Sequence, residues 1–520
     1  MKHVLYALFV VSCLSASAQT IEWQKSFGGS GAETVSKIIN TPDGGFLVGT
    51  ITESNNGDVS GNHGATDIWL LKLDAAGQKQ WQKCLGGLGT DAITGLENTV
   101  AGGYILTGTT ASNGPKNSAQ VFGNHGDLDV WVAKVDALGN IEWRKCYGGC
   151  SRDEARSVRQ TSDGNYCVVG GTMSNNTGDV YGYHTDWDAW VLLIDPKGDM
   201  IWQKTIGGSG VDYLYDVAVT NDGGFVLGGL SSSTDGDLSG IINKGGEDYW
   251  IAKLSASGDL LWSKSYGGSS NDGIRGMCLA TDGSIVVTGL TFSQNGDVTS
   301  PHGGSDMWVL HLNANGGLLW QKTYGGAGAD VAFTVFQRSD NDFITIGETA
   351  SNDQDVMGNH GGRDIWVVKF DVNGVLKSQK CLGGSSDDIA RAACKGAADA
   401  FTIGGWSSSF DGDVSQNFGL SDTWIVKMNL PLGLKPNISN PDGFGISVFP
   451  DPASDIVLVS TNMPGTKQIT VFDLNGQLIQ TLETEEFTKS LQIDPLPVGV
   501  YVLRMTSKNG VILTAKFVKN

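Results

Sequence analysis

The chain has 520 residues, including 74 glycines and 15 tryptophans, and a formal net charge of −20. This acidic balance excludes a nucleic-acid-binding protein of the usual basic kind, since there is no basic patch or stripe to contact phosphates. The tryptophan content excludes a disordered glycine-rich chain, and the length leaves room for more than one domain.

The N-terminus predicts a secretory signal peptide over residues 1–18. Met1-Lys2-His3 is followed by an apolar run, Val4 to Leu14, and by the small residues Ala16-Ser17-Ala18, which is the order of a signal peptide and its cleavage site. A lipobox ending at Cys13 is the alternative. No later apolar run is long enough to span a bilayer, so no transmembrane segment is expected.

One tripeptide, Asp-x-Trp, then recurs at an almost constant spacing of about 60 residues, which is typical of a repeat architecture. Its aspartates are Asp67, Asp129, Asp188, Asp248, Asp306, Asp364 and Asp422. Each repeat contains four short segments rich in β-branched and aromatic residues and bounded by Gly, Asp and Asn. In the first repeat they begin near residues 33, 46, 67 and 80. The pattern predicts an all-β fold with a seven-bladed β-propeller over residues 21–430.

A second motif, Trp-x-Lys, predicts how the ring closes. Its first copy, at Trp23, precedes the first complete repeat, and the last repeat stops after its third strand, at Lys427. Residues 21–27 are therefore expected to be the outermost strand of the last blade, which leaves no exposed edge there. The tryptophans of both motifs are expected to pack between neighbouring sheets.

The C-terminal part has a different pattern, with a linker at 431–445 and a small β module at 446–520. It contains Pro450-Asp451-Pro452-Ala453, an Asp473 to Gly476 turn and a Gly499-x-Tyr501 strand. These residues resemble the type A C-terminal sorting domain of the type IX secretion system of Bacteroidetes, with Asp451 where the family usually has Asn. The resemblance implies an Ig-like β-sandwich, the secretion machinery as partner, export across the outer membrane, and a secreted or cell-surface location. The motif residues are Pro450, Pro452, Asp473, Gly476, Gly499 and Tyr501.

An acidic residue begins the first strand of every repeat, four residues after a Gly-Gly pair. The set is Glu33, Asp91, Asp153, Asp212, Asp272, Asp330 and Asp388. Clustered carboxylates at the mouth of the channel would bind cations. Alternatively, each carboxylate accepts backbone N–H bonds from its own turn. Repetition in every blade favours the second interpretation, since it serves a blade better than a single site.

The long loop before each Asp-x-Trp carries further metal-ligating residue types. Its aspartates Asp58, Asp179, Asp237, Asp297 and Asp413 are candidate Ca²⁺ ligands, and no other cofactor is expected. Histidines occupy one loop position in five repeats, at His63, His125, His184, His302 and His360. Because they lie on different blades, they are predicted to brace loops rather than to converge on one metal ion.

Residues that break the repeat are the candidates for ligand binding. The third repeat's loop has Tyr181, Tyr183 and Trp187, which would stack on sugars or partner side chains, or pack locally. On the first strands, Arg156, Tyr215, Arg275 and Arg391 vary between repeats. They would point into the channel and either bind an anion or pair with the acidic residues.

No catalytic motif is present. We therefore predict a monomeric, non-enzymatic binding protein for a polysaccharide or another surface protein. The alternatives are a glycan-active hydrolase or lyase, and a structural surface protein without a discrete ligand.

Overall fold

The computed structural model describes residues 20–114, 120–396, 400–429, 446–449, 453, 455–461, 463–473 and 476–519. The predicted signal peptide, the predicted linker, and Pro450 and Pro452 lie outside these residues. The repeat region, Ile21–Met428, forms one compact unit, and the chain from Asn429 onward belongs to another.

The repeat region is built from four-stranded antiparallel sheets whose strands pair in chain order. The first three sheets are β2 (Glu33–Asn40), β3 (Phe46–Thr52), β4 (Asp67–Leu73), β5 (Lys79–Leu85); β6 (Asp91–Asn98), β7 (Tyr104–Thr110), β8 (Asp129–Val135), β9 (Ile141–Tyr147); and β10 (Asp153–Gln160), β11 (Tyr166–Thr172), β12 (Asp188–Ile194), β13 (Met200–Ile206). The next three are β14 (Asp212–Val219), β15 (Phe225–Ser231), β16 (Asp248–Leu254), β17 (Leu260–Tyr266); β18 (Asp272–Leu279), β19 (Ile285–Thr291), β20 (Asp306–Leu312), β21 (Leu318–Tyr324); and β22 (Asp330–Gln337), β23 (Phe343–Thr349), β24 (Asp364–Phe370), β25 (Leu376–Leu382).

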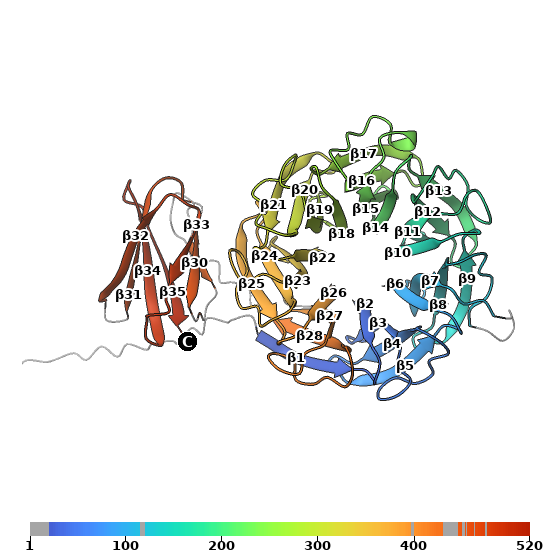
Figure 1. The fold of residues 1–520 in the computed structure, drawn as a ribbon, viewed down its shortest axis with the longest axis horizontal. Coiled ribbons are helices and arrows are strands. Elements are labelled where there is room, and N and C mark those ends of the chain that lie inside the picture. The colour runs from blue at the N-terminus through green and yellow to red at the C-terminus, as the bar shows by residue number, and fades with distance from the viewer. Residues whose placement is uncertain are drawn as a thin grey trace, which may run out of the picture. The chain divides into compact units, whose positions relative to one another are not determined.

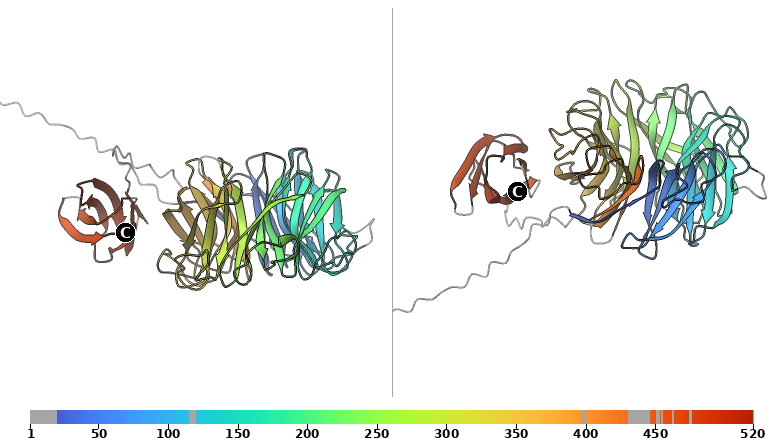
Figure 2. Two further views of the ribbon diagram at one scale, coloured as in Figure 1. Left: turned by 90° about the horizontal axis from the view of Figure 1, so that it is seen from above. Right: turned by 60° about the horizontal axis from the view of Figure 1, so that its bottom comes forward.

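These sheets surround a common axis, as expected for a β-propeller. Figure 1 looks along the axis, with β2, β6, β10, β14, β18 and β22 nearest to it. In Figure 2 the loops gather at the two ends of the axis. A short 3-10 helix, η1 (Gly236–Leu238), lies in one of the long loops.

The remaining sheet of the ring joins the two ends of the repeat region. Its strands are β26 (Asp388–Lys395), β27 (Ala400–Ser407), β28 (Asp422–Asn429) and β1 (Thr20–Phe27), with β1 paired to β28. The Trp424 indole N–H donates to Gln24 Oε1 at 2.8 Å across this pair. The predicted closure by the N-terminal strand is confirmed.

The Asp-x-Trp tryptophans are core residues, as predicted, and all are at most 2% exposed. Most of their indole N–H groups reach the outer strand of the same sheet, as in the 2.8 Å bond from Trp69 Nε1 to Gln82 Oε1. The Trp-x-Lys tryptophans are half-buried. Trp23 covers Gly77, where a Cβ atom would lie 2.9 Å from the indole ring. The Asp-x-Trp tryptophans are thus buried in the core, and the Trp-x-Lys tryptophans cover turns of the neighbouring sheet.

The C-terminal domain has two antiparallel sheets around one core. One contains β29 (Ile446–Phe449), β30 (Ile456–Thr461) and β33 (Thr488–Gln492), and the other β32 (Leu478–Thr484), β31 (Lys467–Asp473), β34 (Gly499–Ser507) and β35 (Ile512–Lys519). Val457 and Leu503 are fully buried in this core, with Phe517 beside them. Nowhere in the described chain is there a helix with the length and apolar character needed to cross a membrane.

Candidate functional site

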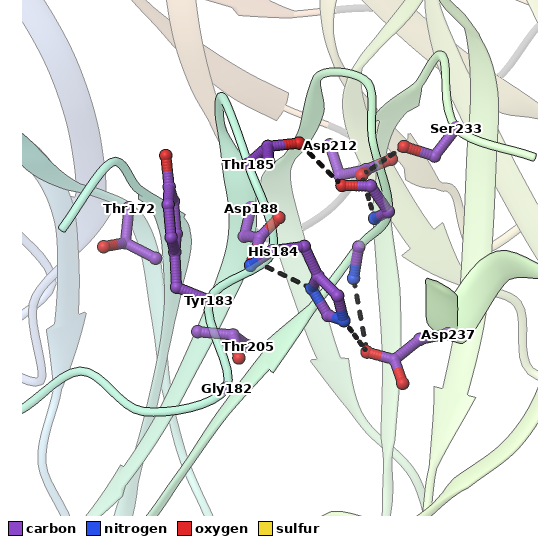
Figure 3. Close-up of polar contacts among 12 residues, drawn as sticks. Thr172, Gly182, Tyr183, His184, Thr185, Asp188, Thr205, Asp212, Ser233 and Asp237 are labelled. Carbon is purple, nitrogen blue, oxygen red and sulfur yellow. Dashed lines mark hydrogen bonds and ion pairs between the residues drawn. The ribbon is translucent and has the colours of Figure 1, made fainter. Parts of the chain in front are cut away.

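The acidic residues that begin the inner strands are buried hydrogen-bond acceptors. All seven are at most 1% exposed. Asp212 accepts hydrogen bonds from Gly208 N at 2.9 Å and Ser233 Oγ at 2.7 Å, and burial raises the pKa of its carboxyl group to about 6 (Figure 3). The interpretation that each acid satisfies its own turn is confirmed. The alternative of an exposed, cation-binding collar is wrong, because the carboxylates are sealed inside the turns.

The Asp-x-Trp aspartates lie beside these acids and brace the long loops. Asp188 accepts hydrogen bonds from His184 N at 2.7 Å and His184 Nδ1 at 3.0 Å (Figure 3). Asp212 N donates to Trp187 O at 2.7 Å and so links the two neighbouring sheets. Equivalent His–Asp pairs occur at His63, His125, His302 and His360. The histidines therefore brace loops, as predicted.

One oxygen of every Asp-x-Trp aspartate is buried and has no hydrogen-bond partner within the described residues. For Asp188 this is Oδ1, which faces Gly207. A Cβ atom on Gly207 would lie 2.5 Å from Asp188 Oδ1 and 2.8 Å from Asp212 Oδ2. The two carboxylates thus flank a glycine that has no space for a side chain, and each raises the cost of ionising the other.

The candidate calcium ligands are loop anchors in this structure. Asp297 accepts a hydrogen bond from Lys244 Nζ at 2.5 Å, and Asp58 forms an ion pair with Lys79. Asp237 Oδ2 lies 3.7 Å from His184 Nε2. Asp179 and Asp413 accept backbone N–H groups at 3.2 and 3.4 Å. In the described parts of the chain, no three or more His, Cys, Asp or Glu residues are grouped so that they could hold a metal ion.

The aromatic residues of the third repeat's loop do not form one patch. Tyr181 is 63% exposed, and its carbonyl oxygen accepts bonds from Gln203 and Thr205 on the outermost strand β13. The Tyr183 hydroxyl donates to Asp186 O at 2.6 Å. Trp187 instead packs edge-on against Tyr213 of the innermost strand β14, with ring centroids 5.2 Å apart. Only Trp187 lies beside the channel.

A β-bulge occurs in every inner strand, between its third and fifth residues. The bulged residues are Ser36, Thr94, Arg156, Tyr215, Arg275, Phe333 and Arg391. A bulge changes the direction of a side chain relative to regular alternation. The four inner-strand residues predicted as ligand contacts all belong to this set. Each inner strand therefore has one variable residue at its bulge.

Trp187 and five residues on or next to the inner strands form a group that we call the mouth cluster: Arg152, Glu154, Arg156, Trp187, Tyr213 and Tyr215. Arg156 donates to the Tyr213 hydroxyl and to Glu154 Oε2, both at 2.8 Å. Arg152 pairs with Glu154 at 2.6 Å, and its guanidinium lies 6.0 Å from the Trp187 ring centroid. Arg156 is therefore paired, but with Glu154 rather than with one of the strand-initiating acids.

Arg275 and Arg391 line a cavity of about 390 Å³ between the inner strands. The Arg275 guanidinium lies 4.2 Å from the Tyr215 ring centroid, and that of Arg391 lies 4.2 Å from Phe333. Neither arginine forms an ion pair within the described residues, and Arg275 Nη1 is buried without a hydrogen-bond partner. The alternative in which these arginines pair with the strand-initiating acids is therefore wrong.

Sequence reasoning missed several residues of this region, including Lys37, Phe333, Glu154 and Tyr213. Their signal is present, because their repeat positions are among the most variable of the inner strands. It could not be interpreted because the bulge breaks the alternation that normally separates channel-facing from sheet-facing positions.

The described residues of the sorting motif stabilise the C-terminal domain. The Tyr501 ring stacks on Phe517 at 5.4 Å, and its hydroxyl donates to Pro497 O at 2.7 Å. Asp473 Oδ1 accepts a hydrogen bond from Gln477 N at 2.8 Å across the turn, where Gly476 has a φ of +80°. Gly499 begins β34, beside Tyr501.

These features define an all-β protein with a propeller of repeated sheets and a separate C-terminal domain. Residues 447–520 match the family of the secretion system C-terminal sorting domain. The C-terminal domain belongs to this family, so the protein engages the type IX secretion machinery and is exported to the cell surface or the medium.

Three further comparisons concern one curated relative and two solved structures. The chain is 23% identical to the regulatory protein FlaEY of Caulobacter vibrioides over 486 residues, 85% of this chain but 48% of that protein. It thus spans about half the length of this relative. Kuenenia stuttgartiensis hydrazine synthase superposes with a TM-score of 0.41 and 12% identity, covering 74% of this chain and 94% of that one. The Neurospora crassa Pan2 WD40 domain has a TM-score of 0.40 and 11% identity, covering 78% and 94%.

Proposed function

We propose that this protein is a non-enzymatic ligand-binding protein, with a seven-bladed β-propeller that binds and an Ig-like β-sandwich that directs export. The seven Asp-x-Trp repeats and the pairing of β1 with β28 support the blade number. Two packed antiparallel sheets with one core support the sandwich.

The mouth cluster is the observation that carries the binding function. It brings together a half-buried tryptophan, two tyrosines and two arginines, all at positions that break the repeat. Half of the Arg152 side chain is exposed. Tryptophan faces stack on sugar rings and anchor partner proteins, and arginine adds directed hydrogen bonds. The ligand is accordingly a polysaccharide or another surface protein.

A glycan array and a panel of surface-protein fractions would test the proposal with the full chain, with Trp187→Ala, and with Tyr181→Ala as the matched loop variant. We expect binding by the wild-type protein and by Tyr181→Ala, and a loss of at least about tenfold for Trp187→Ala. Equal binding by all three proteins would remove the mouth cluster from the site. Product formation from a polysaccharide would indicate a hydrolase or lyase, and absence of any binding would indicate a structural surface protein.

A further inference from the structure

The cavity between the inner strands has an uneven distribution of charge. On one side, Arg159 Nη2 pairs with Asp216 Oδ1 at 3.2 Å. Glu97 lies beside this pair and accepts Gln160 N at 2.6 Å. On this side Arg159 and Asp216 are thus paired with each other, and the Arg159 charge lowers the pKa of Glu97 against the raising effect of its burial.

The opposite side carries cations without partners. Lys37 on β2, Arg275 on β18 and Arg391 on β26 line the same cavity, and the side chain of none of them forms a hydrogen bond or ion pair within the described residues. Strands β18, β22, β26 and β2 are successive packed neighbours around the axis. The three cationic groups thus share one wall, with Phe333 of β22 between the two arginines.

This arrangement costs stability. Burial lowers the pKa of both Lys37 and Arg391. The Asp216 charge opposes this shift at Lys37 and the Glu348 charge opposes it at Arg391, whereas the Arg363 and Arg275 charges lower the pKa of Arg391 further. Stacking on Tyr215 and Phe333 orients the guanidinium planes and offsets only part of the desolvation. Asp216 and Glu348 act on Lys37 and Arg391 through their charges, but within the described residues they form ion pairs with Arg159 and Arg363 instead.

We propose that this wall binds a multiply charged oxyanion, whose negatively charged oxygens are held between Arg275, Arg391 and Lys37. The cavity has the volume of a small-molecule site. Guanidinium groups suit the planar geometry of carboxylate and phosphate oxygens, and the lysine adds a point charge. Tyr215 contacts both Arg275 and Arg156 and so adjoins the mouth cluster, but none of the three cationic groups belongs to that cluster, and the proposal does not depend on glycan or protein binding there.

Isothermal titration of the full chain with inorganic phosphate and with citrate tests this site and separates phosphate from carboxylate recognition. We expect one binding site for at least one of the two anions, weakened by added sodium chloride. Arg275→Gln and Arg391→Gln should each weaken binding at least about tenfold. Lys145→Gln removes an exposed charge paired with Asp199 on the outer surface and should bind like the wild type.

Thermal unfolding without ligand gives an independent test. Because the cations are unpaired, Lys37→Met and Arg391→Met should raise the melting temperature, whereas removal of structural residues would lower it. If Arg391→Gln fails to fold, Arg391→Lys keeps the charge and should bind more weakly than the wild type. The proposal is overturned if the wild-type protein binds neither anion at millimolar concentration, if the Gln variants bind as tightly as it does, or if both Met variants lower the melting temperature.

Discussion

Asp212→Asn tests whether the acids between the sheets destabilise the propeller when they ionise. Burial raises the pKa of Asp212 from 3.8 to about 6, and Asp188 contributes in the same direction. A shift of about two units corresponds to roughly 3 kcal/mol. Because the folded-state pKa is the higher one, this stability is fully present below the unfolded pKa and is lost as pH rises through about 6.

Between pH 5 and pH 7.5, this linkage predicts that the wild-type protein loses roughly 1 kcal/mol through Asp212 alone. Asparagine keeps an acceptor for Gly208 N and presents an NH₂ group in a region where Asp188 Oδ1 lacks a partner. The free energy of unfolding of Asp212→Asn minus that of the wild type should therefore be about 1 kcal/mol larger at pH 7.5 than at pH 5, which means that the variant is relatively more stable at the higher pH.

Urea denaturation followed by tryptophan fluorescence at the two pH values measures this difference. Asp235→Asn is the matched control, because Asp235 is exposed and its bond from Ser209 N lowers its pKa. Its contribution has the opposite sign, since it is present above the unfolded pKa and is lost as pH falls. The linkage would be refuted if the unfolding free energy of Asp212→Asn minus that of the wild type were independent of pH, or were smaller at pH 7.5 than at pH 5.

Three further variants test the fold. Trp308→Ala should cost about 3–5 kcal/mol in urea denaturation, because the side chain is 0% exposed and its indole N–H donates to Gln321; a cost under 1 kcal/mol would contradict its core role. Deletion of residues 20–27 removes β1 and exposes the edge of β28, so light scattering should detect self-association, and a stable monomer would argue against closure by this strand. Tyr501→Phe removes the bond to Pro497 O and should lower the stability of the C-terminal domain by about 1 kcal/mol in thermal unfolding, with secretion into the medium retained.

Sequence periodicity was sufficient to predict the sheets, the closure by β1 and the burial of the Asp-x-Trp tryptophans. The physical reason is that each repeat is one sheet that must bury its faces against its neighbours, so residues with that task recur at every period. The same logic correctly assigned the strand-initiating acids to their own turns and the loop histidines to the bracing of loops.

The candidate site was less predictable. Tyr181 and Trp187 are six positions apart in one loop, but the loop carries one to the outermost strand and the other to the innermost. Lys37 was not identified, because the bulge between Val35 and Lys37 breaks the alternation that would mark it as a channel residue. Which groups pair depends on contacts between strands about 60 residues apart, as with Arg159 and Asp216.

The sequence by itself determined the repeat, the order of the strands and the destination of the protein, because these depend on local patterns and on the motifs of the C-terminal domain. Only the tertiary structure decided which variable side chains meet. Ring closure brings β26 against β2 and so places Arg391 and Lys37 on one wall, although more than 350 residues separate them. Neither group forms an ion pair within the described residues, because the carboxylates that act on them, Asp216 and Glu348, are paired with Arg159 and Arg363.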